Sequence, residues 1–186
     1  GTEEVYCAVS TFGTDGGIEV TASHNPIDYN GMKIVKQGSQ PLSEKEFSNI
    51  KKLAEVGNFV NSERCGSVIN VQTDARETYI EKILEFVNLK KLKPLKIVIN
   101  SGNGAAGPTI DLLNRKLKEE GVKTNFVYVH HKPDHSFPNG IPNLLLEENR
   151  SATSNAVVRE QADFGVALDG DFDRCFLFDH KGNFIP

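Results

Sequence analysis

Three aspartates stand at alternate positions in the segment Asp169-Gly-Asp-Phe-Asp-Arg174, which directly follows an apolar run. Carboxylates this close repel one another at neutral pH unless a cation neutralises them. Their hard oxygen atoms suit Mg²⁺ or Ca²⁺, but His180 stands where an EF-hand calcium loop requires glutamate. We therefore expect Asp169, Asp171 and Asp173 to bind a metal ion. An acidic turn exposed to solvent is the alternative interpretation.

A second candidate is Ser23, in the segment Thr21-Ala-Ser-His-Asn-Pro26, whose residue types suit a tight, exposed turn. A serine hydroxyl is a weak nucleophile unless a base or an electrophilic partner supports it. His24 is adjacent, and Lys33 lies across the loop at the start of the next strand. Arg174 would add a fixed positive charge suited to phosphate. The pattern fits a supported nucleophile, or a turn with no catalytic role.

Two other segments carry weaker signals. Gly102-Asn-Gly-Ala-Ala-Gly107 matches the dinucleotide pattern G-x-G-x-x-G, but histidines follow Val129 where that pattern expects an acid. A strand-to-helix turn that needs small residues for close packing is the favoured interpretation. A loop holds His130, His131 and His135, whose spacing matches no standard metal site, so we expect a solvated loop.

Composition excludes several classes of protein. The formal net charge is −4, which argues against binding to nucleic acid. No apolar run is long enough to cross a bilayer, so no membrane contact is expected. The three cysteines include no Cys-x-x-Cys pair, which fits a reducing cytoplasm better than a disulfide framework. Cys175 lies in a strand-like run, and we expect a buried structural thiol there.

The elements that must position these residues form an α/β protein in two parts, residues 1–90 and 91–186. For the first part the patterns predict strands at Val5–Val9, Gly17–Thr21 and Met32–Lys36, a helix from a capping box at Ser43-Glu-Lys-Glu46 to Val56, a surface loop at Gly57–Ser67, and a helix at Asp74–Leu89. Because this part begins in mid-pattern, we expect one or more strands before Gly1.

The second part alternates strand and helix, which predicts an α/β domain with a mixed, largely parallel sheet. Its predicted strands are Leu95–Asn100, Asn125–Val129 and Phe164–Leu168, its helices are Pro108–Glu120 and Ser151–Gln161, and a hairpin of Cys175–Phe178 and Phe184–Ile185 closes it. The aspartates then follow the carboxyl end of a strand, where open α/β sheets bind ligands.

Taken together, these segments resemble the α-D-phosphohexomutases, the phosphomannomutase and phosphoglucomutase superfamily. The segment at 21–26 is similar to the family's active-site serine loop, and the segment at 169–174 to its metal loop. The glycine-rich turn and Phe137-Pro-Asn-Gly-Ile-Pro-Asn143 resemble further family segments. The resemblance covers almost the whole chain and is closest to bacterial phosphomannomutases of the GDP-mannose pathway. Leu144 and His135 depart from the family's usual proline and glycine.

The resemblance implies a four-domain enzyme. Residues 1–90 would be the later part of the first domain, with the serine loop, and residues 91–186 the second domain, with the metal loop. The third domain, which reads the sugar, and the fourth, which clamps the far phosphate, would be missing. The chain alone would then have little or no mutase turnover.

The resemblance also implies the residue roles. Ser23 would carry the phosphoryl group, and one Mg²⁺ would be bound by Ser23, Asp169, Asp171 and Asp173. Lys33 would be the general acid/base, while His24 and Arg174 would orient or neutralise the phosphoryl group. The reaction would interconvert mannose 6-phosphate and mannose 1-phosphate through a hexose 1,6-bisphosphate.

Other functions stay open at this point. They are a phosphoglucomutase or dual-specificity mutase, a Mg²⁺-dependent phosphatase with an aspartyl nucleophile in the acidic loop, and a non-catalytic nucleotide- or phosphate-binding module.

Overall fold

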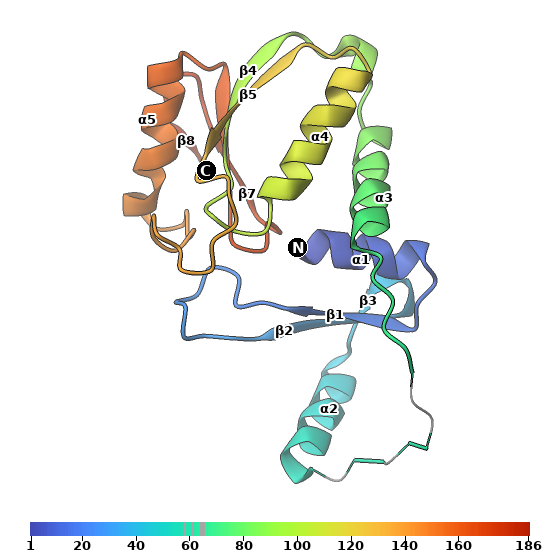
Figure 1. Cartoon of the computed structure of the whole chain (residues 1–186). Helices are drawn as coiled ribbons and strands as arrows, with labels where there is room; N and C mark the ends of the chain where they lie inside the picture. The colour runs from blue at the N-terminus through green and yellow to red at the C-terminus, as the bar shows by residue number, and fades with distance from the viewer. Residues whose placement is uncertain (58, 61, 64–65) are drawn as a thin grey trace.

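The computed structural model describes residues 1–57, 59–60, 62–63 and 66–186. Part of the loop predicted at Gly57–Ser67 therefore lies outside the described residues. The strands form two sheets (Figure 1). The first sheet has the order β1-β2-β3, from β1 (Gly16–Val20), β2 (Met32–Lys36) and β3 (Gln40–Pro41). The second has the order β5-β4-β6-β7-β8, from β4 (Leu95–Asn100), β5 (Thr124–Val129), β6 (Phe164–Leu168), β7 (Cys175–Phe178) and β8 (Phe184–Ile185).

The second sheet is mixed, as the alternating pattern predicts. Strand β4 pairs parallel with both β5 and β6, while β6-β7 and β7-β8 are antiparallel. Helices α4 (Gly107–Glu119) and α5 (Ser151–Glu160) lie on opposite sides of this sheet (Figure 1). Its core includes Val98, Val157 and Phe178, which are all completely buried. The largely parallel arrangement does not extend to the first sheet, where both strand pairs are antiparallel.

The strand predicted at Val5–Val9 is wrong, because these residues lie in helix α1 (Thr2–Thr11). β-branched residues favour a strand locally, yet Val5 and Val9 are four residues apart and share one helical face. Both lie against Gly17 of β1: a Cβ atom on that glycine would be 3.1 Å from Val5 Cγ1 and would collide with Val9. Packing on the first sheet therefore outweighs the local preference.

The remaining helices follow the predicted order. The capping box is confirmed in α2 (Glu44–Val56), where the backbone N–H of Glu46 donates to Ser43 Oγ at 3.3 Å and the Glu46 carboxylate accepts from the backbone N–H of Ser43. Helix α3 (Gln72–Glu85) ends four residues before the predicted Leu89, and three short 3₁₀ helices cover Gln37–Ser39, Leu89–Lys91 and Glu147–Arg150. No helix among the described residues is long and apolar enough to span a bilayer.

A buried polar cluster joins helices α1, α3 and α4. Glu4 Oε1, on α1, accepts hydrogen bonds from Arg76 Nε of α3 at 2.9 Å and from Thr109 Oγ1 of α4 at 2.6 Å. Figure 1 shows α3 running alongside α4 and meeting α1 at its lower end. The cluster thus ties α1, which packs on the first sheet, to α4, which packs on the second sheet.

Candidate active site

The serine loop and the acidic loop meet although 146 residues separate Ser23 from Asp169. Ser23 lies in the connection between β1 and β2, and Asp169 follows directly after β6. Ser23 Oγ donates a hydrogen bond to Asp169 Oδ2 at 2.7 Å. The β1–β2 hairpin therefore places the Ser23 hydroxyl beside the Asp169 carboxylate, which follows the carboxyl end of β6.

Two glycines allow this approach. A Cβ atom on Gly170 would collide with the carbonyl oxygen of Ser23. A Cβ atom on Gly104, in the glycine-rich turn after β4, would lie 2.5 Å from the carbonyl oxygen of Gly170. The backbone N–H of Ala105 donates to that same oxygen at 2.9 Å. The glycine-rich turn is therefore filled by protein backbone, which confirms the interpretation as a close-packed strand-to-helix turn.

Ser23 is held in a backbone conformation that non-glycine residues rarely adopt, with φ at +54°. Its backbone N–H donates to Thr21 Oγ1 at 2.8 Å, which stabilises this tight turn. Strained residues of this kind persist where the surrounding structure determines them, and they cluster at functional sites. The turn leaves Ser23 Oγ directed toward the acidic loop.

Arg174 joins the hydroxyl to the carboxylate. Its Nη2 donates to Ser23 Oγ at 3.0 Å and to Asp169 Oδ2 at 2.6 Å, and its Nε donates to the same Oδ2 at 2.9 Å. Nη2 also contacts His24 Nδ1, which lies 3.2 Å from Ser23 Oγ. The guanidinium therefore places positive charge beside the serine oxygen, where a phosphoryl group on Ser23 would lie.

Asp171 is 2% exposed and its two oxygen atoms differ. Oδ2 accepts hydrogen bonds from Lys33 Nζ at 2.7 Å and from Thr2 Oγ1 at 3.0 Å, while Oδ1 is buried and has no hydrogen-bond partner. Burial raises the pKa of Asp171, but the hydrogen bond from Lys33 leads a group of interactions that outweigh burial and hold the pKa below its usual value. The carboxylate is therefore charged at neutral pH.

Lys33 bridges two of the aspartates. Its Nζ also donates to Asp173 Oδ2 at 2.5 Å. Desolvation lowers the pKa of Lys33, yet the hydrogen bonds to Asp171 and Asp173 exceed that effect and raise the pKa above its usual value. Lys33 therefore stands as an ammonium among the carboxylates.

The acidic group fits a divalent cation. One oxygen atom from each of Asp169, Asp171 and Asp173 lies within 4.8 Å of the others. An unpaired buried acceptor such as Asp171 Oδ1 is costly unless a cation or donor reaches it. Three carboxylates suit Mg²⁺ chemically, since it prefers hard oxygen ligands.

In the loop that holds His130, His131 and His135, one histidine packs against neighbouring side chains. His131 stacks on Tyr128 with ring centroids 4.1 Å apart, and its Nε2 lies 2.9 Å from Asp111 Oδ1. Across the ranges that the structure describes, the three aspartates are the only cluster of three or more potential metal ligands. His131 therefore has a stacking partner and a polar contact within the protein.

Two residues differ from expectation. Cys175 is exposed rather than buried. Side chains of β7 alternate between the two faces of the sheet, and Phe178 takes the buried face while Cys175 lies on the outer one. Thr2, which sequence reasoning missed, is buried and bonded to Asp171 across 169 residues. No local spacing signals that contact.

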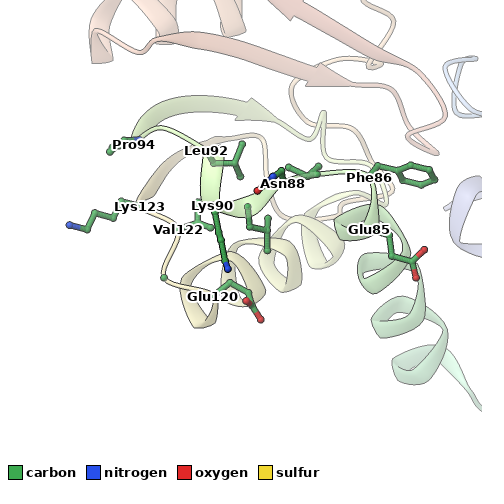
Figure 2. Close-up of a pocket in the computed structure, with 12 residues that line it drawn as sticks. Glu85, Phe86, Asn88, Lys90, Leu92, Pro94, Glu120, Val122 and Lys123 are labelled. Atoms are coloured by element: carbon green, nitrogen blue, oxygen red, sulfur yellow. The ribbon is translucent and has the colours of Figure 1, made fainter.

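A wide hollow in the described part of the molecule lies away from these residues. Figure 2 shows it at the end of α3, beside the turn that joins α4 to β5. Its volume is about 980 Å³, and it is lined by residues 85–90, 92, 94 and 120–123. None of the candidate catalytic or metal-binding residues lines it, so cavity size does not identify the site in this chain.

Comparisons with known proteins relate the chain to one family. A family model described as "Phosphoglucomutase/phosphomannomutase, alpha/beta/alpha domain II" matches residues 77–182, and the corresponding domain I model matches residues 1–61. The chain is 53% identical to a phosphomannomutase of Salmonella montevideo and 50% identical to one of Escherichia coli K12, in each case covering 100% of this chain and 41% of the relative. The chain thus spans about two fifths of the length of these relatives.

A solved structure leads to the same family. A phosphoglucomutase/phosphomannomutase family protein from Burkholderia thailandensis superposes with a TM-score of 0.78 at 31% identity, covering 99% of this chain and 39% of that one. Because the domain II model alone covers more than half of the sequence, the assignment does not depend on one relative. The chain belongs to the phosphoglucomutase/phosphomannomutase family.

Proposed function

We propose that this chain carries the phosphoserine and metal-binding loops of a mutase that interconverts mannose 6-phosphate and mannose 1-phosphate. One observation supports the proposal most strongly. Ser23 Oγ lies 2.7 Å from Asp169 Oδ2 and accepts a hydrogen bond from Arg174, so a nucleophile, a metal-ligand candidate and a fixed positive charge share one site. Relatives named phosphomannomutase support mannose as the sugar, with phosphoglucomutase or dual-specificity activity as the alternative.

In the proposed cycle Ser23 begins as a phosphoserine. A hydroxyl of the hexose monophosphate attacks the phosphorus atom, a new P–O bond forms to the sugar, and the P–O bond to Ser23 Oγ breaks. The product is a hexose 1,6-bisphosphate, which turns over in the site and returns its other phosphate to Ser23. Lys33 is proposed as the general acid/base: its ammonium gives a proton to Ser23 Oγ as the P–O bond breaks, and the resulting amine takes the proton of the sugar hydroxyl. His24 and Arg174 are proposed to orient the phosphoryl group.

The proposed metal site consists of Ser23, Asp169, Asp171 and Asp173. A bound Mg²⁺ would supply positive charge for the transferring phosphoryl group, for which positioning and electrostatics provide most of the catalysis. Residues 1–90 would then belong to the first domain and residues 91–186 to the second domain of a longer enzyme. Hexose phosphates are its proposed small-molecule partners.

Intact-mass spectrometry tests the phosphoserine. We expect a hexose 1,6-bisphosphate with Mg²⁺ to add one phosphate to the wild-type protein, in the longest active form that contains this chain, and none to the Ser23→Ala variant. Full mutase activity in Ser23→Ala would refute the proposal. A phosphate adduct on an aspartate of the acidic loop, with release of inorganic phosphate, would favour the phosphatase alternative instead.

A nucleotide-binding module makes a different prediction. It requires heat or a thermal shift on titration with NAD or ATP. Because backbone atoms of Gly170 fill the space beside Gly104, we expect neither signal.

A further inference from the structure

Thr2 is a buried hydroxyl within the acidic cluster, and it has no part in the proposed cycle. Thr2 is 1% exposed and is the first residue of α1. Thr2 Oγ1 donates to Asp171 Oδ2 at 3.0 Å, and the backbone N–H of Thr2 donates to the carbonyl oxygen of Asp171 at 3.2 Å. One residue therefore holds both the side chain and the main chain of Asp171.

The direction of these hydrogen bonds is determined by Lys33. Lys33 Nζ lies 3.3 Å from Thr2 Oγ1 and has only hydrogens to offer, so the threonine oxygen accepts there. The single hydroxyl hydrogen of Thr2 is then free for Asp171 Oδ2. As a result Oδ2 has two donors, whereas Oδ1 is buried with none.

The two donors to Asp171 Oδ2, Lys33 and Thr2, differ in charge. The Lys33 ammonium repels a divalent cation that approaches the same carboxylates, because like charges in a poorly solvated site disfavour one another. The Thr2 hydroxyl is neutral and carries no such penalty. When a cation binds the cluster, Thr2 is therefore the donor that stays compatible with it.

We infer that Thr2 is a positioning residue for the metal site: it holds Asp171 through Oδ2 and leaves Oδ1 for the cation. The inference rests on the proposed metal site and adds a residue that makes no contact with the metal itself. Groups that orient metal ligands in this way typically change metal affinity by about 10–100-fold when mutated.

The test is calorimetric titration of MgCl₂ into the longest folded form of the protein that contains this chain. Thr2→Val keeps the shape and removes the hydroxyl, and we expect about 10-fold weaker Mg²⁺ binding or more. Thr2→Ser restores the hydroxyl and should restore affinity close to wild type. Thr153→Val is the matched control, because Thr153 is equally buried and its hydroxyl accepts from Asn100 Nδ2 at 2.9 Å rather than bonding to an aspartate of the cluster.

The outcomes separate this inference from the proposed function. Wild-type binding with unchanged affinity in Thr2→Val overturns the role of Thr2 and leaves the metal site in place. If Thr2→Ser binds Mg²⁺ as weakly as Thr2→Val, the role of Thr2 is also overturned. This outcome can be judged from Thr2→Ser and wild type even if Thr2→Val folds poorly. A folded wild type that binds no Mg²⁺ overturns the metal site, and the inference with it. Thr153→Val with weakened binding would show a general effect of lost buried hydroxyls and overturn the specific role.

Discussion

Gly104→Ala tests whether the glycine-rich turn positions the acidic loop. The new Cβ atom would lie 2.5 Å from the carbonyl oxygen of Gly170, 2.9 Å from its Cα and 3.0 Å from its carbonyl carbon. Ordinary van der Waals contact begins at 3.4 Å, so the closest pair falls short by about 1 Å. All three neighbours are backbone atoms, which have no flexible end to move aside. The turn and the acidic loop must therefore separate.

The expected effect has two parts. Overpacking of this kind costs about 1–3 kcal/mol of the free energy of unfolding, and each kcal/mol lowers the Tm of a domain of this size by about 2–4 °C. A misplacement of about 1 Å in a reacting constellation can cost about 100-fold in rate. Because Gly170 also packs on Ser23, we expect slower phosphorylation of Ser23 in addition to the lower Tm.

The assay measures the rate at which a hexose 1,6-bisphosphate phosphorylates Ser23, by intact mass, beside the thermal unfolding midpoint. Gly66→Ala is the matched control, because a Cβ atom on Gly66 meets nothing within 4 Å. If Gly104→Ala had the same Ser23 phosphorylation rate and the same Tm as Gly66→Ala, the steric reasoning would be refuted. A lower Tm with an unchanged rate would refute the claim that this contact positions the site.

Two further predictions concern stability. Arg76→Met removes the guanidinium beside Glu4 and leaves that carboxylate with one hydrogen bond fewer. We expect the free energy of unfolding in urea to fall by about 3 kcal/mol. A loss below about 0.5 kcal/mol would show that the cluster does not join the helices. The pKa of Asp171 is lowered in the folded state, so its contribution to stability is present above its unfolded value near 3.8 and is lost as the pH falls through the folded value. In metal-free buffer the free energy of unfolding should therefore fall less below pH 4 in Asp171→Asn than in wild type. An equal fall in both proteins would contradict the lowered pKa of Asp171.

Several features could be predicted from local sequence. The capping box at Ser43, the mixed second sheet and the hairpin that ends at Ile185 depend on short-range preferences and on a repeating polarity pattern. The acidic segment was recognisable because three carboxylates at alternate positions are unfavourable without a cation, whatever the fold around them. Its place after β6 followed from the order of strands and helices.

Other features depended on contacts between distant residues. Val5 and Val9 form a helix because Gly17 and the first sheet accept that helical face, which outweighs their local preference for a strand. Cys175 is exposed because Phe178 lies on the buried face of β7. Packing of the core, and not the sequence of the strand, determines which face is buried.

The site shows the same division. Sequence alone identified Ser23, Lys33, Arg174 and the three aspartates as chemically suited residues. Their distances, the unpaired Oδ1 of Asp171 and the hydroxyl of Thr2 beside it came only from the tertiary structure. The reason is physical: residue type determines which chemistry a side chain supports, whereas burial and the close backbone packing at Gly104 and Gly170 determine which side chains meet.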